Sequence, residues 1–173
     1  SADTLAGAQS KVDAARGPGM RYKLLHDRAN LDHVQVDDFN WPCQPDASGP
    51  DFFLYDLSWA AFSSGNVDWA SLAAETGIEV NGLSTLRNAM GALFDRHAAC
   101  AIAVKSQHAY NRTLLWQDRS DTDASAALSR ILKAEGPVDE ATRLCLGDWC
   151  WARGVELAID HDLPFKLHTG YNA

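Results

Sequence analysis

The residue in this chain with the clearest potential for chemistry is Lys105. It closes an apolar run, AACAIAVKS, so its aliphatic stem must lie against the core, where an ammonium group without a partner is costly. A buried lysine that loses its proton can react with carbon dioxide, and the resulting carbamate offers two oxygens to a metal ion. The alternative is that Lys105 reaches solvent or pairs with Asp37, Asp38 or Asp56.

Three more candidates follow in the segment SQHAYNRTLLW: His108, Tyr110 and Arg112. The planar guanidinium of Arg112 could hold a substrate carboxylate through two parallel hydrogen bonds. His108 or Tyr110 could give or accept a proton. The structural alternative is that Arg112 pairs with an acid such as Asp118 and that Tyr110 only packs.

His168 stands at the end of another apolar run, in PFKLHTG. Thr169 and Gly170 follow it, and these small residues would let a ligand approach the backbone closely. A neutral imidazole at a strand end is a good ligand for zinc or a similar divalent ion. A histidine in this position can equally be an ordinary structural or surface residue.

The elements that must position these residues alternate between strands and helices. We expect strands at 31–39, 51–59, 98–106 and 163–168, and helices at 4–16, 20–30, 83–94, in the segment ending at Ile131 and from Pro137 onward. Such alternation predicts an α/β fold with a parallel sheet. Ligands of these folds bind at the carboxyl ends of the strands, where the acids of the first two strands, Lys105 and His168 would meet.

The helix after Pro137 contains two glycines within an apolar pattern. We expect Leu144, Trp151, Val155, Ala158 and Ile159 to share its buried face. Gly147 and Gly154 are candidate points for a bend or break. Asp148 falls on the apolar side, so we expect it to be buried with a partner such as Arg153.

Composition narrows the class of protein. The chain has 173 residues and a formal net charge of -8, which predicts one domain and disfavours a nucleic-acid partner. No apolar run is long enough to cross a bilayer, and the first residues do not resemble a secretion signal, so we expect a cytoplasmic protein. The spacing of the four cysteines, Cys43, Cys100, Cys145 and Cys150, fits neither zinc nor thioredoxin motifs, and we expect them to be buried thiols.

Two stretches resemble a known family. The segment AIAVKSQHAYNRTLLW and, some 50 residues later, GVELAIDHDLPFKLHTGY are similar to the central part of the amidohydrolase superfamily, in particular its amidohydrolase-2 or nodulin-like branch. The resemblance covers residues 20–173. It implies a (β/α)8 barrel of the TIM type and hydrolysis by a metal-activated water, with zinc as the first choice of metal and manganese as the second.

The same resemblance assigns roles to individual residues. His168 matches the metal ligand of the fifth strand, and Lys105 matches the fourth-strand lysine that some members carbamylate. His108, Tyr110 and Arg112 are then catalytic or substrate-contacting residues. The expected partner is a small-molecule substrate, with a carboxylate as one candidate, and a homo-oligomer is a further option.

The resemblance is incomplete. The family's first-strand H-x-H pair, a later histidine and the last-strand aspartate have no counterpart here. A closed barrel needs about 250 residues, so we expect residues 1–173 to form one partial metal-dependent hydrolase domain covering about half of the barrel. Two alternative hypotheses are a decarboxylase or uronate-isomerase-like enzyme on the same fold, and a catalytically incomplete fragment or assembly module.

Overall fold

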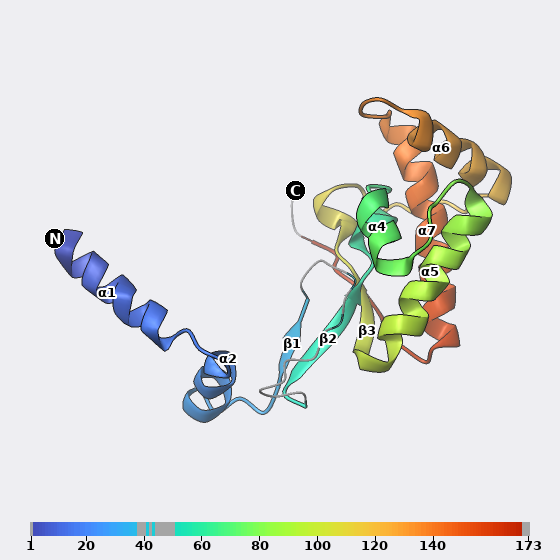
Figure 1. Ribbon diagram of the computed structural model, residues 1–173. Helices are drawn as coiled ribbons and strands as arrows, with labels where there is room; N and C mark the ends of the chain where they lie inside the picture. The colour runs from blue at the N-terminus through green and yellow to red at the C-terminus, as the bar shows by residue number, and fades with distance from the viewer. Residues whose placement is uncertain (1, 38–40, 42, 44–50, 171–173) are drawn as a thin grey trace. The chain divides into compact units, whose positions relative to one another are not determined.

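The computed structural model describes residues 2–37, 41, 43 and 51–170, without the side chains of residues 2 and 3 (Figure 1). Its contacts divide the chain into two compact units. The first consists of residues 1–36 and 44–54, and the second of residues 37–43 and 55–173. No helix among the described residues has the length and apolar character needed to cross a membrane.

The first unit contains helices and the edge of the sheet. Its elements are α1 (Ala2–Ala15), α2 (Met20–Tyr22), the π-helix η1 (Lys23–Arg28) and β1 (Val34–Val36). Aromatic contacts hold α2 in place: the Tyr22 ring meets Phe52 edge-on at 5.2 Å, and the Arg21 guanidinium lies 4.7 Å from the centre of the Phe53 ring. The described side chains of α1 are all exposed to solvent.

Four strands form one sheet in the order β1-β2-β3-β4. The strands β2 (Phe53–Ser58), β3 (Ala101–Ser106) and β4 (Phe165–Leu167) pair in parallel, with an irregularity in β2 between Tyr55 and Asp56. Strands and helices alternate along the chain as the sequence predicts. The predicted α/β class with a parallel sheet is therefore confirmed.

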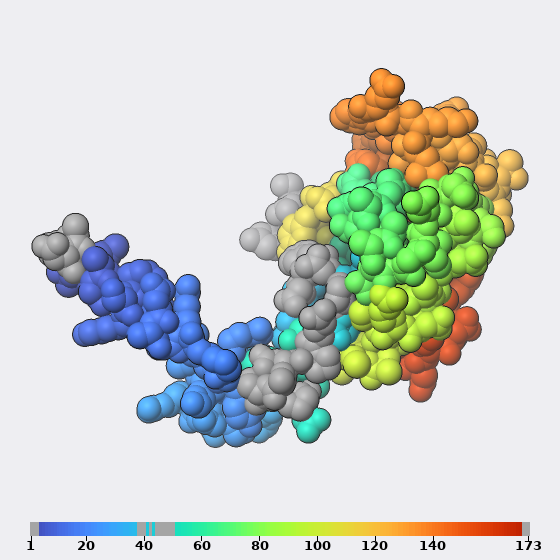
Figure 2. Space-filling model, in the orientation of Figure 1, coloured from blue at the N-terminus to red at the C-terminus, as the bar shows by residue number. Residues whose placement is uncertain are grey.

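The second unit contains the remaining helices. They are α3 (Ala60–Ser63), α4 (Trp69–Thr76), α5 (Leu83–His97), α6 (Asp121–Lys133) and α7 (Glu140–Asp160), with 3-10 turns η2 (Ala98–Cys100) and η3 (His108–Tyr110). Asp68, Ser120 and Asp139 cap α4, α6 and α7 by accepting hydrogen bonds from backbone N–H groups of the first turn. The sequence reading had not anticipated α3 and α4. In Figure 2, α4, α5 and α6 lie on the visible surface of this unit.

The long helix α7 corrects the expectation of a bend or break. It is continuous through Gly147 and Gly154. A Cβ on Gly154 would lie 2.1 Å from Nε1 of Trp59, and one on Gly147 would lie 2.6 Å from the Ser63 carbonyl oxygen. Both glycines are sites of close packing, because α3 and the residue before it lie directly against the helix.

The buried face of α7 also differs from the predicted one. Only Ala158 of the five predicted residues is buried, and Ile159 is 72% exposed. The buried apolar residues are Leu146, Trp149, Cys150 and Ala158, together with the two glycines. Burial of Asp148 is confirmed, and burial of Cys100 was wrong, because this residue lies in η2 ahead of β3 and is exposed.

Candidate functional site

The sheet of the second unit has two chemically different faces. Strand register places Leu57, Val104 and Phe165 in one row across β2, β3 and β4. The next row consists of Ser58, Lys105 and Lys166. Because paired residues of parallel strands point to the same side and successive residues to opposite sides, one face is apolar and the other polar.

Helix α7 lies on the apolar side. Beyond the end of β3, the ring of His108 contacts Trp151 of α7 at a centroid distance of 5.0 Å, and its Nδ1 lies 2.7 Å from Oγ of Ser106, which is on the same side of β3 as Val104. We call the opposite side, defined by Asp56, Ser58, Lys105, Lys166 and His168, the polar face.

Two ion pairs occupy the polar face. Lys166 Nζ lies 2.5 Å from Asp56 Oδ1, and Lys105 Nζ lies 3.4 Å from Asp37 Oδ2. Gln107 also donates a hydrogen bond from Nε2 to Asp37. The two lysine side chains are 33% and 27% exposed, whereas the Asp56 side chain is fully buried. In each ion pair the lysine side chain is therefore partly exposed, whereas its carboxylate partner is buried.

Asp56 has unusual electrostatics. Burial raises the pKa of its carboxyl group above the ordinary value of 3.8, and the nearby charge of Asp37 adds to this. The hydrogen bond and charge of Lys166, and the charge of Lys105, act in the opposite direction. Burial dominates, so the carboxyl group is protonated more readily than an exposed aspartate.

The position of Lys105 bears on the carbamate hypothesis. Its ammonium group pairs with Asp37, which was one of the alternatives that the sequence left open. A carbamate on Nζ would remove the positive charge that pairs with Asp37, so in this arrangement Lys105 is the cationic partner of Asp37.

His168 lies just beyond β4 on the polar face. Its backbone N–H donates to the Ser106 carbonyl oxygen at 3.0 Å, and its ring stacks on Tyr110 with centroids 4.9 Å apart. The Nε2 atom is buried and has no hydrogen-bond partner among the described residues. Tyr110 is half exposed, and His168 is partly buried.

The donor set does not fit a metal site within the described part of the chain. His168 and Lys105 were the predicted ligands, yet no group of three or more His, Cys, Asp or Glu side chains is arranged to hold a metal ion among residues 2–37, 41, 43 and 51–170. A structural zinc site needs four ligands and a catalytic one needs three. Among the described residues, His168 and Lys105 therefore lack the further ligands that a zinc or manganese ion needs.

His108 lies beyond the end of β3, beside Ser106 and Trp151 of α7. It is fully buried, its Nδ1 is 2.7 Å from Ser106 Oγ, and its Nε2 has no hydrogen-bond partner among the described residues. Burial lowers its pKa to about 4, the charge of Arg112 contributes in the same direction, and Asp148 opposes it. The ring is therefore neutral near pH 7.

Arg112 is enclosed by protein groups. Its guanidinium donates to the carbonyl oxygens of Ser63, Thr113 and Leu115 at 2.9 to 3.0 Å, and to Asp148 Oδ1 at 2.6 Å. Only 1% of the side chain is exposed, so it is not placed to bind a substrate. The partners of Asp148 are Arg112 and Arg119, not Arg153 as expected.

The sequence analysis did not identify Lys166, Gln107 or Ser58 as candidates. The alternation of polar and apolar residues in YDLS and KLH could have indicated a polar face, because polar residues occupy every second position there. Short apolar runs hide this pattern when they are read as uniformly buried strands.

Comparison with models of known protein families finds none that matches this chain. Comparison with curated proteins finds no significant relative.

Proposed function

We propose that the second unit belongs to a hydrolase of the amidohydrolase type, in which the polar face binds a small-molecule substrate at the carboxyl ends of the strands. The observation that carries this proposal is the row of charged side chains on the side of the sheet opposite α7. More specifically, we propose that the parallel strands are part of a (β/α)8 barrel. Active sites of such barrels form at the carboxyl ends of the strands.

The chemistry assigned to the site uses groups of this chain. The ammonium groups of Lys105 and Lys166 bind a carboxylate or polarise a carbonyl group of the substrate. Asp37 and Asp56 are positioning residues, because each holds one ammonium group in place. His168 exchanges a proton with the reacting groups, and Tyr110 contacts the substrate beside it.

The test is turnover by the full chain on amides and lactones of small carboxylic acids. We expect Lys166→Met and His168→Ala each to lower kcat/KM by about 100-fold, the size typical of losing one general acid–base or charge-stabilising group. Lys133→Met, which removes an exposed charge from α6, is the matched control and leaves the rate unchanged. Absence of turnover in the wild type, or full retention in both variants, would contradict the proposal.

The hypothesis that His168 binds a metal ion is tested separately, by the zinc content of the purified chain. One zinc per chain that is lost in His168→Ala supports His168 as a ligand within a set completed by residues that the structure does not describe. Equal zinc content in the wild type and the variant would exclude this role.

A second candidate reaction is decarboxylation or sugar-acid isomerisation at the same face. Two lysines in register on adjacent strands favour it, because they can bind a substrate carboxylate together. Aromatic carboxylates and uronates in the same assay separate these reactions from hydrolysis.

A further inference from the structure

A hollow lies away from the polar face, within the second unit. Two loops enclose it: Gly65–Val67 between α3 and α4, and Gly136–Val138 between α6 and α7. Ile131 of α6 and Arg143 of α7 complete the lining, and the volume is about 280 Å³. This is near the lower end of the range for small-molecule sites.

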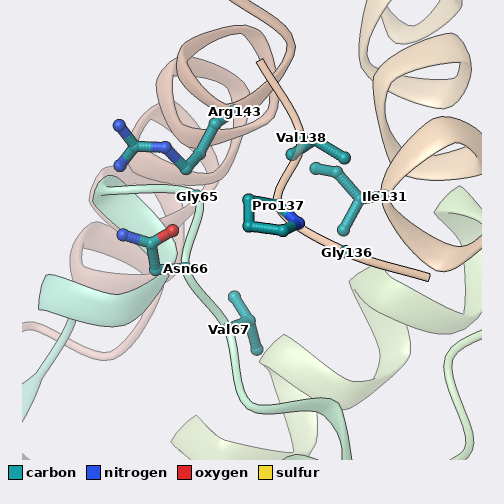
Figure 3. Close-up of a pocket in the computed structure, with 8 residues that line it drawn as sticks. All are labelled: Gly65, Asn66, Val67, Ile131, Gly136, Pro137, Val138 and Arg143. Carbon is teal, nitrogen blue, oxygen red and sulfur yellow. The ribbon is translucent and has the colours of Figure 1, made fainter. Parts of the chain in front are cut away.

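The lining has an apolar part and a polar part. Figure 3 shows the side chains of Ile131, Pro137 and Val138 grouped together, with Val67 below them. The Arg143 guanidinium and the Asn66 amide both extend away from this apolar group in the view. The lining of the hollow therefore combines apolar side chains with two side chains that can donate hydrogen bonds.

The guanidinium of Arg143 is weakly engaged. Its only hydrogen bond to the described residues runs from Nη1 to the Ser64 carbonyl oxygen at 3.4 Å, and it forms no ion pair with them. Two of the acids that adjoin the loops, Asp68 and Asp139, accept hydrogen bonds from helix N-termini. Asp68 accepts from the N–H groups of Ala70 and Ser71, and Asp139 accepts from the N–H of Thr142.

The loop that carries Asn66 is held rigidly against α7. Gly65 has a φ of +67°, and a Cβ at this position would lie 2.1 Å from the Arg143 carbonyl oxygen. Only glycine combines this backbone conformation with such a close approach. The backbone that carries Asn66 therefore packs directly against the backbone of α7.

We propose that this hollow is a binding site for a small organic carboxylate with a branched apolar body. The fork of Arg143 matches the geometry of a carboxylate, the Asn66 amide can donate a further hydrogen bond, and the apolar side chains cover the body of the ligand. Glu135 and Glu140 are exposed beside the loop and oppose an anion, so we expect a Kd on the order of 1 mM. The site is independent of the function proposed for the polar face.

The experiment is an NMR titration of the full chain with 4-methylpentanoate, followed through the backbone amides of Gly65 and Gly136. We expect saturable shifts at both amides. We also expect 4-methylpentanamide, which has the same body without the charge, and inorganic phosphate, which has charge without the body, to bind at least about tenfold more weakly. If the neutral amide bound as tightly as 4-methylpentanoate, Arg143 would have no role in binding. If phosphate bound as tightly, the apolar side chains of the hollow would have none.

Three variants test which side chains contribute to binding. Arg143→Gln and Asn66→Asp should each weaken 4-methylpentanoate by about tenfold or more, the first by loss of the guanidinium and the second by repulsion. Both positions are on the surface of the unit, so we expect an unchanged melting temperature. Lys11→Gln removes one positive charge from α1 and should leave the affinity unchanged. Absent or non-saturable shifts, or equal affinity in all three variants, would exclude the site.

Discussion

Charged residues of the second unit are held in two different ways. Arg112 and Asp148 are almost completely covered, and protein groups take up most of their hydrogen-bonding capacity. Lys105 and Lys166 each have one carboxylate partner and remain about one third exposed or less. Because a substrate needs an accessible charge, the lysines and not Arg112 are the residues available to bind one.

His108 gives a pH-dependent prediction. Its pKa is about 4 in the folded chain, against an ordinary value of 6.5, so between these values the unfolded chain binds the additional proton. The free energy of unfolding should therefore fall as the pH is lowered from about 6.5 to about 4, by an amount on the order of 3 kcal/mol for this residue. Above about pH 6.5 its contribution is constant.

Urea unfolding at several pH values measures this effect. Taking the difference between wild type and His108→Gln cancels the titration of all other groups. We expect that difference to shrink as the pH is lowered through the window. A constant difference would show that the proton affinity of His108 is the same in the folded and unfolded chains.

At the scale of elements, the contact between α7 and the segment after β2 depends on glycine. Trp59 is fully buried and donates a hydrogen bond from Nε1 to the Cys150 carbonyl oxygen at 3.0 Å. Its ring occupies the space beside Gly154, where a side chain would otherwise lie. The helix and the segment after β2 can approach this closely only because the helix lacks a Cβ at Gly154.

The change that tests this packing is Gly154→Ala. The added methyl group would displace the Trp59 ring, so we expect a loss of about 3 kcal/mol in the free energy of unfolding. Gly91→Ala in α5 is the control, because nothing lies within 4 Å of a Cβ at that position. It should stabilise the chain by about 0.5 to 1 kcal/mol through helix propensity. Equal effects of both substitutions would contradict the packing argument.

At the scale of the molecule, the two units differ in how much they bury. The second unit contains a helix-covered sheet with fully buried residues such as Leu57, Val104 and Trp149. In the first unit, α1 spans 14 residues, and its described side chains, including Leu5 and Val12, are exposed. An isolated helix of this length is marginal in water without tertiary contacts.

Deletion of residues 1–14 tests whether α1 stabilises the rest of the fold. Because the described side chains of this segment are exposed, we expect the melting temperature to change by less than about 2 °C. Calorimetry on the full and shortened chains measures it. A larger drop would show that α1 contributes contacts that stabilise the fold.

The sequence by itself determined the type and order of most elements, although not α3 and α4. Periodic apolar residues predict α5, the segment from Pro137 onward predicts α7, and the run before Lys105 predicts β3. These features are local, so they can be read from neighbouring residues. The parallel sheet follows from the alternation of strands with helices.

Only the tertiary structure decided which side chains meet. Lys166 pairs with Asp56 because the register of β2, β3 and β4 places both on one face, and Arg112 reaches Asp148 because α7 packs beside the loop after β3. The buried face of α7 was misread for the same reason, since Gly147 and Gly154 are buried by what packs on them. Contacts between distant segments depend on strand register and helix packing, which no local pattern of residues specifies.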